Sequence, residues 1–339
     1  MKRKEKRWLA VLLLMTAALV VCVFWNLSAG STKIGAGRIL EILAGKEADS
    51  SEASVILKIR LPRIYCAMLA GGALSVSGYL LQTFFANPIA GPYILGISSG
   101  AKLFVAFVMI AFVARGAALS SSAQVLAAFA GALAAAGFVL LISARVKSMS
   151  VLVVCGIMIG YICSAVTDLL VTFADDSNIV NLHNWSQGSF SGLNMTDASL
   201  MAAFIVPAVA LALLLSKPIG AYRLGEAYAA SLGVNVKALR AALILLSSLL
   251  TATATAFAGP ISFVGIAVPH LMKNASSDTR PLSLIPVCFI GGAAVTLACD
   301  GLARTLFAPT EVAASSVSAV VLAPVVIVMM LRRKGARRD

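Results

Sequence analysis

The sequence predicts an all-α polytopic membrane protein with ten transmembrane helices. Of its 339 residues, 60% are hydrophobic and 12% are charged, and the mean hydropathy is +0.95. Soluble globular domains contain roughly 45–50% apolar and about 25% charged residues, so this composition excludes that class. Apolar runs of about 20 residues, the length of helix that crosses a hydrocarbon core about 30 Å thick, recur along the chain. Basic clusters flank the first and the last of these runs, which is typical of ends held in the cytoplasm.

Ten apolar segments are expected to cross the membrane within a single integral domain, residues 1–339. Their approximate bounds are 8–27, 63–86, 93–114, 117–143, 148–173, 196–216, 238–258, 260–272, 281–306 and 311–331. The segment 260–272 is the shortest, because a helix of that length spans only about 20 Å. Ten crossings leave both termini on the same side, in agreement with the basic clusters at the two ends.

The first segment is expected to stay as a membrane anchor rather than to be removed as a signal peptide. Its apolar run, Trp8 to Leu27, is longer than the roughly 7–15 residues of a signal-peptide core. After it, residues 35–45 have the pattern of a short amphipathic helix on the outer surface. Four apolar residues of that helix are expected to be available to the membrane interface: Ile39, Leu40, Ile42 and Leu43.

Two long uncharged stretches are interrupted by proline. Residues 64–101 carry no charge, and Asn87-Pro88 and Gly91-Pro92 divide them, because proline lacks the N–H that a helix interior needs. Residues 241–272 are divided by Gly259-Pro260. A short echo, GPYILGI and GPISFVGI, accompanies the two interruptions. Interrupted hydrophobic segments in corresponding parts of two halves indicate a transporter built from repeats.

The basic residues orient the chain. Those near the ends of the spans on the cytoplasmic side are expected to be Arg145, Lys147, Lys217, Arg223, Lys237, Arg240, Lys273 and Arg280. Outside connections hold fewer basic residues, with residues 31–63 as the exception. Because the net charge of +13 gathers beside the spans, we expect no nucleic-acid partner.

Sequence motifs for catalysis are absent. No GxxxxGK[ST] loop is present, so the chain is not expected to hydrolyse ATP. The two histidines, His183 and His270, do not form an HExxH motif, and the six cysteines lack metal-ligand spacing. We therefore expect no catalytic residue, no bound metal and no cofactor.

Asp300 and Arg304, in or near the ninth span, stand four residues apart and are able to pair on one helix face. A local ion pair and a role in docking a partner both remain open for them. The polar connection 217–237 contains an expected short helix, Gly225 to Leu232, that ends at Gly233 in a C-cap position. This connection is either a plain cytoplasmic linker or a segment that transmits motion from a partner.

Six ordered motifs resemble those of a known family. They are RLPR at 60–63, ALSVSGYLLQ at 73–82, NPIAGPYILGISSGA at 87–101, LGEAYAASLGV at 224–234, AGPISFVGIAVPHL at 258–271 and CDGLAR at 299–304. Together they resemble the FecCD family, the membrane subunits of type II ABC importers for ferric siderophores, haem and cobalamin, over residues 8–333. The resemblance implies an inverted-repeat permease fold with ten spans, a multi-pass protein of the inner (cytoplasmic) membrane with both termini inside.

The resemblance also implies partners. It indicates a second copy of the permease in a homodimer, two separate ABC ATPase subunits, and an extracytoplasmic substrate-binding protein, all assembled around the lipid bilayer. Ferric siderophore is the first cargo expected, ahead of cobalamin and haem. The alternative is a secondary transporter driven by an ion gradient, and a membrane-embedded enzyme is a third class.

Site residues follow from the same resemblance. The segment that couples to the ATPase is expected to use Leu224, Gly225, Glu226, Ala230, Leu232 and Gly233. Docking of the binding protein is expected to use Arg60, Arg63 and Arg304. The gate of the translocation path is expected to include Gln82, Asn87 and Pro88, although Asn87 alternatively caps the next helix.

The chain departs from the family pattern near its end. Glu311 is followed by VAASSV, and Leu322 stands where a glycine is common before the last proline. The resemblance therefore implies nothing specific about how the tenth span packs.

Overall fold

The computed structural model describes residues 2–30, 34–46, 50–113, 121–146 and 148–335, and these residues form helices and connections without a strand. The α-helices are α1 Lys2–Ser28, α2 Ala36–Leu43, α3 Ser51–Val55, α4 Leu61–Phe84, α5 Ile97–Val113, α6 Ser121–Arg145, α7 Met149–Thr172, α8 Asp176–Ser186, α9 Met195–Leu214, α10 Ser216–Tyr222, α11 Glu226–Ser231, α12 Val236–Ala258, α13 Val264–Ser276, α14 Pro281–Thr305 and α15 Ala314–Gly335. A π-helical turn, Ile56–Arg60, and a 3-10 turn, Pro92–Leu95, complete them.

The all-helical membrane fold is confirmed, whereas ten full-length spans are not. Seven helices within the described residues are long and apolar enough to cross a membrane, namely α1, α4 with its N-terminal extension, α6, α7, α9, α12 and α14. The apolar parts of α5 and α15, Ile97–Ala111 and Ala314–Val328, are shorter. Helix α13 has 13 residues. It corresponds to the expected segment 260–272, which was the shortest of the ten.

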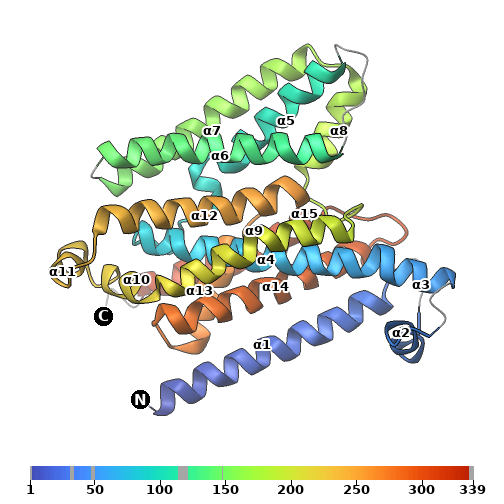
Figure 1. The fold of residues 1–339 in the computed structure, drawn as a ribbon, viewed down its shortest axis with the longest axis horizontal. Coiled ribbons are helices and arrows are strands. Elements are labelled where there is room, and N and C mark those ends of the chain that lie inside the picture. Colours follow the sequence, from blue (N-terminus) through green and yellow to red (C-terminus); the bar gives the residue numbers. More distant parts are fainter. Residues whose placement is uncertain (1, 31–33, 47–49, 114–120, 147, 336–339) are drawn as a thin grey trace.

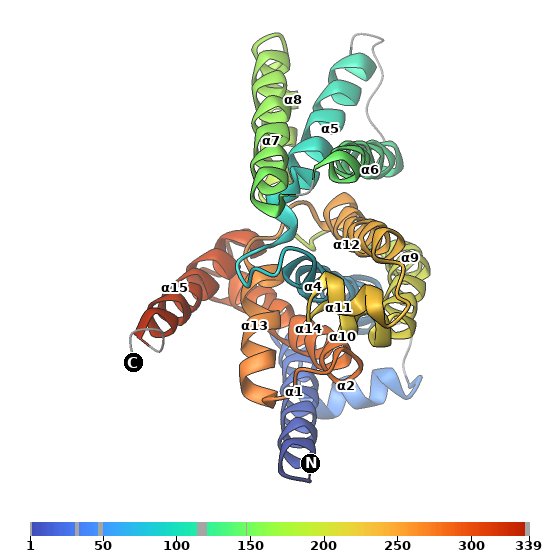
Figure 2. The ribbon, with the colours of Figure 1, turned by 90° about the vertical axis from the view of Figure 1, so that its left-hand side faces the viewer.

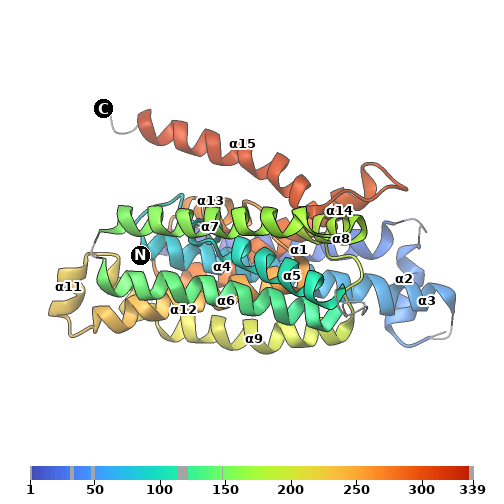
Figure 3. The same ribbon diagram turned by 90° about the horizontal axis from the view of Figure 1, so that it is seen from above.

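Helix α4 is the centre of the bundle, and α9, α12, α13 and α14 pack around it (Figure 2). Helices α5, α6 and α7 form a second group that contacts this centre through α12. Helix α15 contacts α14 and α13, and its C-terminal part extends away from the bundle (Figure 3). Most of the buried apolar side chains belong to a single continuous core.

Both predicted interruptions are present, and they lie against each other. The chain leaves the helical conformation after Phe84 and again after Ala258, and Gly259 and Phe263 have positive φ angles of 70° and 63°. A Cβ atom placed on Gly265 would lie 2.8 Å from Cδ of Pro92, so the start of α13 touches the 3-10 turn. The two echoing motifs therefore meet inside the bundle.

Several helical segments differ from the expected bounds. The second span does not begin at residue 63, because α3 and the π turn extend it to a continuous helix Ser51–Phe84. Its start is capped by Ser50, whose hydroxyl accepts a hydrogen bond from the amide of Ala53 at 3.1 Å. Helices α8 and α10 form within segments that the sequence left as connections.

The predicted amphipathic helix is present as α2, but only two of its four apolar residues are available to the membrane interface as expected. Ile39 and Ile42 are 1% and 2% exposed and belong to the protein core, while Leu40 and Leu43 are exposed. Helix α2 packs against α1.

The N-terminal and C-terminal helices begin and finish, respectively, at the same end of the bundle. The start of α1, the end of α15 and helices α10 and α11 lie at this end, on the left of Figure 1, while α2, α3 and α8 lie at the opposite end. We call these the α11 end and the α8 end. The arrangement agrees with termini that share one side of the membrane with the connection 217–237.

Candidate functional site

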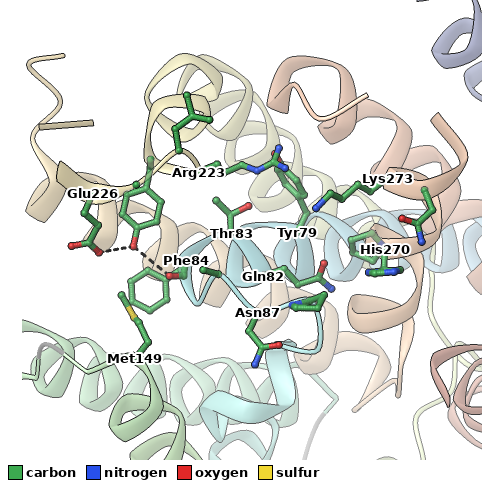
Figure 4. Close-up of a pocket in the computed structure, with 17 residues that line it drawn as sticks. Tyr79, Gln82, Thr83, Phe84, Asn87, Met149, Arg223, Glu226, His270 and Lys273 are labelled. Carbon is green, nitrogen blue, oxygen red and sulfur yellow. Dashed lines mark hydrogen bonds between the residues drawn. The ribbon is translucent and has the colours of Figure 1, made fainter. Parts of the chain in front are cut away.

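A pocket of about 780 Å³ opens at the α11 end (Figure 4). Its walls come from the last turns of α4 and the residues after it, the start of α7, the α10–α11 connection, and α13. Six residues predicted as functional line it: Gln82, Asn87, Pro88, Leu224, Gly225 and Glu226. The structure thus brings the predicted gate and the first part of the predicted coupling segment into one site.

The coupling segment is built from two short helices between α9 and α12. Gly225 and Gly233 flank α11 with φ angles of 129° and 81°, conformations that favour glycine. The amide of Gly233 donates to the carbonyl of Ala230 at 3.0 Å, and Asn235 caps α12 by accepting from Ala238 at 3.0 Å. The predicted helix and its glycine terminator are confirmed. Ala230, Leu232 and Gly233 are exposed at the bundle end and lie outside the pocket.

Glu226 connects α11 to its neighbours. The Tyr222 hydroxyl lies 2.9 Å from Oε1 of Glu226 and 3.3 Å from the carbonyl oxygen of Phe84, the last residue of α4. Arg240 Nη1 lies 3.7 Å from the same Glu226 oxygen, and its guanidinium stacks 5.4 Å from the centre of the Phe84 ring. Burial, together with the hydrogen bond to Glu226, raises the pKa of Tyr222. Tyr222 therefore links the first residue of α11 to the last residue of α4.

The predicted gate residues have separate contacts. Gln82 Nε2 donates to the carbonyl of Ile266 at 3.1 Å and so joins α4 to α13. The side-chain oxygen of Asn87 accepts from the amide of Ile89 at 3.2 Å, which is a local turn. The alternative in which Asn87 caps the next helix is wrong, because that helical turn starts after Gly91.

At the α8 end, Arg63 belongs to a buried charge network. Its guanidinium donates to both oxygens of Asp300, at 2.8 and 3.0 Å, and to Glu311 at 2.9 Å. Arg304 Nε lies 3.7 Å from the second Asp300 oxygen. The local pairing of Asp300 with Arg304, one of the two alternatives left open, is therefore present.

The other contacts of the network reach the last turn of α1. Arg304 donates to the side chain and the carbonyl of Asn26, and Arg60 donates to the carbonyl of Leu27. The last carbonyls of a helix lack partners within the helix and attract cations. Arg304 and Arg60 therefore join the end of α1 to α14 and to the π-helical turn before α4.

Burial limits what the three predicted docking residues offer to a partner. Arg60, Arg63 and Arg304 are 3%, 6% and 8% exposed. Their guanidinium groups contact acids and carbonyls of the same chain, and the side chain of Glu311, 46% exposed, lies over Arg63. All three lie at the α8 end, and their role in docking a binding protein stays a prediction.

Several pocket residues were not among the predicted site residues. They are Tyr79, Thr83, Phe84, Met149, Tyr222, Arg223, His270, Lys273 and Asn274, with Ala86 and Pro269 beside them. The sequence showed Arg223 and Lys273 only as orienting charges of two different connections. Nothing in their spacing indicated that α10 and α13 would place them in one pocket.

Comparisons with known proteins agree on the family. The model of the FecCD transport family matches residues 18–332. The chain is 34% identical over 283 residues to the hemin transport system permease protein HmuU of Yersinia pestis, covering 83% of this chain and 84% of that protein. It is 33% identical over 335 residues to the vitamin B12 import system permease protein BtuC of Klebsiella pneumoniae, covering 98% of this chain and 96% of that protein.

The fold is also that of solved transporters. A metal-chelate type ABC transporter in an inward-facing conformation matches 95% of this chain and 99% of its own, with a TM-score of 0.84 and 27% identity. PsaBC from Streptococcus pneumoniae, solved with a Fab, shares the fold with a TM-score of 0.55 at 17% identity over 86% of this chain. The family model spans nearly the whole helical bundle that builds the pocket, and the chain belongs to the FecCD transport family.

Proposed function

We propose that the chain is the membrane permease subunit of an ABC importer that takes up a metal chelate, and that a separate ATPase drives it. The observation that carries the proposal is the pocket at the α11 end, where Glu226 of the coupling segment and Gln82 of the gate share one cavity. The family match and the two permease relatives support the same conclusion.

Among metal chelates, haem and cobalamin are the first cargoes to test. The relatives HmuU and BtuC are named for hemin and vitamin B12, and ferric siderophore remains the other cargo class of the resemblance. The first expectation from sequence, a ferric siderophore, therefore moves behind the two tetrapyrrole-type chelates.

The mechanism we propose is alternating access. ATP binding and hydrolysis in the partner move α11, and the Tyr222 contact with Glu226 and Phe84 passes that movement to the end of α4. Gln82, two residues before Phe84, holds α13 through Ile266, so the same movement reaches the interrupted segment. The spans then open toward one side of the membrane at a time.

The proposed assembly is a homodimer of this permease in the inner membrane with two ATPases and an extracytoplasmic binding protein. Both termini and the α11 end face the cytoplasm. We propose that Arg60, Arg63 and Arg304 form the region on which the binding protein docks, although their side chains are largely buried. Arg63 becomes available to an acidic partner only when the exposed Glu311 carboxylate moves away from it. A charge pair with the binding protein would then guide the orientation and the rate of docking.

Reconstitution tests the proposal. The permease, co-expressed with its ATPase and binding-protein partners, is placed in proteoliposomes, and uptake of hemin, cyanocobalamin and a ferric siderophore is measured. Uptake of one chelate that requires ATP and the binding protein is expected. Uptake that continues without the ATPase and follows an imposed ion gradient would instead establish the secondary transporter.

A further inference from the structure

Lys102 of α5 lies near the middle of the membrane. A Cβ atom placed on Gly100 would lie 2.6 Å from the carbonyl oxygen of Gly131, so α5 crosses α6 two residues before Lys102. Gly131 follows Ser121 by ten residues and precedes Arg145 by fourteen, so the two ends of α6 are about 15 Å and about 21 Å from the crossing. A lysine side chain is too short to reach the membrane surface from that depth.

Lys102 has no ionic partner in the part of the chain that the structure describes. Its side chain is half-buried and forms neither an ion pair nor a hydrogen bond with those residues. Asp300 of α14 is held by Arg63 at 2.8 Å, and Asp168 lies only four residues from the end of α7. Charges at membrane depth are costly and almost always pair or face water, so Lys102 requires water or a partner from outside this chain.

One side of the α5–α7 pair is apolar. A groove of about 250 Å³ lies there, lined by Leu103 and Phe104 of α5, by Ile159 and Ile162 of α7, and by residues of α6. None of its lining residues is charged, and the Ile162 side chain is 63% exposed. Such a surface is compatible with lipid acyl chains.

The opposite side of the same pair is polar. Lys102 stands two residues from Phe104, and Ser164 stands two residues from Ile162, so each polar side chain points about 160° away from its apolar neighbour. Asp168 continues the polar side one turn beyond Ser164, and both are exposed. An unpaired lysine on this side excludes lipid as its environment.

Lys102 and Ser164 also lie at similar depth. Helices α5 and α7 lie side by side (Figure 2). They touch where a Cβ atom on Gly96 would lie 2.9 Å from the amide nitrogen of Gly160. Both helices run from that contact toward the α8 end, and Lys102 is six residues beyond it on α5, while Ser164 is four residues beyond it on α7. Ser164 is therefore a suitable position from which to probe the surroundings of Lys102.

We propose that the polar side of α5 and α7 lines an aqueous path through the permease and that Lys102 selects for anionic solutes within it. This inference rests on the proposed function, because the solute is the chelate that the importer carries. A cation in a path with low-dielectric walls raises the local concentration of anions. The favoured cargo class is a chelate that carries free carboxylates or another anionic group.

Cysteine labelling tests whether the polar side faces water. Ser164→Cys and Ile162→Cys are each made in a chain whose native cysteines are replaced by alanine. The complete transporter is placed in nanodiscs, where both membrane faces are open to membrane-impermeant methanethiosulfonate reagents. Ser164→Cys is expected to react, and Ile162→Cys, the control in the apolar groove, is not. Reaction of both at equal rates, of Ile162→Cys alone, or of neither would overturn the inference.

The charge of the reagent tests the role of Lys102. At Ser164→Cys, the rate with an anionic sulfonate reagent is divided by the rate with a cationic trimethylammonium reagent. Lys102→Gln is expected to lower this ratio about tenfold, equivalent to about 1.4 kcal/mol, and Lys102→Arg is expected to retain it. Lys237→Gln is the matched control, because Lys237 is an exposed base at the start of α12 and is expected to leave the ratio unchanged.

A ratio that Lys102→Gln does not change, or that Lys237→Gln lowers equally, would overturn the inference. A lower melting temperature of Lys102→Gln with an unchanged ratio would also overturn it and would make Lys102 a structural group. The outcome is separable from that of the proposed function, since labelling requires no transport. If the unchanged transporter takes up a chelate with ATP while the ratio does not depend on Lys102, the inference fails and the proposed function stands.

Discussion

Arg63 and Asp300 form a two-pronged ion pair across 237 positions of sequence, with guanidinium–carboxylate distances of 2.8 and 3.0 Å. The Asp300 side chain is 1% exposed, and it also lies 3.7 Å from Arg304. The pair joins α4 to α14 at the α8 end. Bidentate pairs of this kind add geometric specificity as well as energy.

Removal of Asp300 is expected to destabilise the permease strongly. Asp300→Ala leaves Arg63 and Arg304 buried without their shared acid, and breaking a buried pair costs about 3–5 kcal/mol. Thermal unfolding of the purified protein measures the loss. The double variant Arg63→Met with Asp300→Leu is expected to recover most of it. A melting temperature of Asp300→Ala equal to that of the unchanged protein would contradict the network.

Glu311→Gln provides the comparison within the same network. The side chain of Glu311 is 46% exposed, so its pair with Arg63 is partly screened by water. We expect a change below about 1 kcal/mol in the same unfolding assay. A loss of stability as large as that of Asp300→Ala would show that Glu311 and Asp300 contribute equally and would contradict the structure.

A methyl group at Gly78 is expected to prevent α4 and α13 from packing. A Cβ atom there would lie 1.7 Å from the carbonyl oxygen of Gly265, and backbone cannot move aside cheaply. Gly78→Ala should therefore abolish or sharply reduce folded protein, measured by monodisperse yield in detergent. Gly137→Ala is the control, since a Cβ at Gly137 meets nothing within 4 Å. Gly137 lies inside α6, so Gly137→Ala should raise the free energy of unfolding by about 0.5–1 kcal/mol. Equal yields for the two variants would contradict the packing.

Replacement of Glu226 is expected to uncouple transport from ATP hydrolysis. Glu226→Ala removes the contacts to Tyr222 and Arg240 that join α11 to α4 and α12. A charged hydrogen bond contributes about 1.5–3 kcal/mol, so stimulation of the ATPase by loaded binding protein should fall about tenfold or more. Tyr222→Phe, which keeps the carboxylate, should have a smaller effect. Full stimulation in Glu226→Ala would remove α11 from the proposed mechanism.

Asp278 should make a part of the stability dependent on pH. Although burial opposes its ionisation, hydrogen bonds from Arg280 lower the pKa of Asp278 from its ordinary value of 3.8 to about 2. Because the folded pKa lies below the unfolded one, its contribution is complete above about pH 4 and is lost as the pH falls toward 2. Asp278→Asn should lower the melting temperature at pH 7 by about 2–4 °C, and the difference should vanish near pH 2. A difference that is constant from pH 7 to 2 would contradict the ion pair.

Features that depend on local sequence were predicted well. The proline-interrupted stretches appear at Asn87 to Pro92 and at Gly259-Pro260, because a missing N–H ends a helix wherever the chain goes afterwards. The coupling helix and its glycine terminator at Gly233 follow from the same kind of local rule. The bounds of α6, α7, α9, α12 and α14 agree with the expected spans within a few residues, since length and hydropathy set them.

Features that depend on distant partners were not predictable. The ion pair of Arg63 with Asp300 was not predicted, because Asp300 reaches Arg63 only through the packing of α14 on α4. The extension of the second span back to Ser51 was missed because Lys58 and Arg60 interrupt the apolar pattern, although Arg60 is buried by the end of α1. The prediction of repeat symmetry from the two echoing motifs stays a prediction.

The side of the membrane on which α11 lies tests the account most directly. Ala227→Cys on α11 and Ser191→Cys at the α8 end are both at exposed positions, and each is made in a chain whose native cysteines are replaced by alanine. Intact cells are treated with a membrane-impermeant maleimide, and inverted vesicles are treated in the same way. We predict that Ser191→Cys reacts only in cells and Ala227→Cys only in inverted vesicles. Reaction of Ala227→Cys in intact cells would place the coupling segment outside and contradict an ATPase-driven permease.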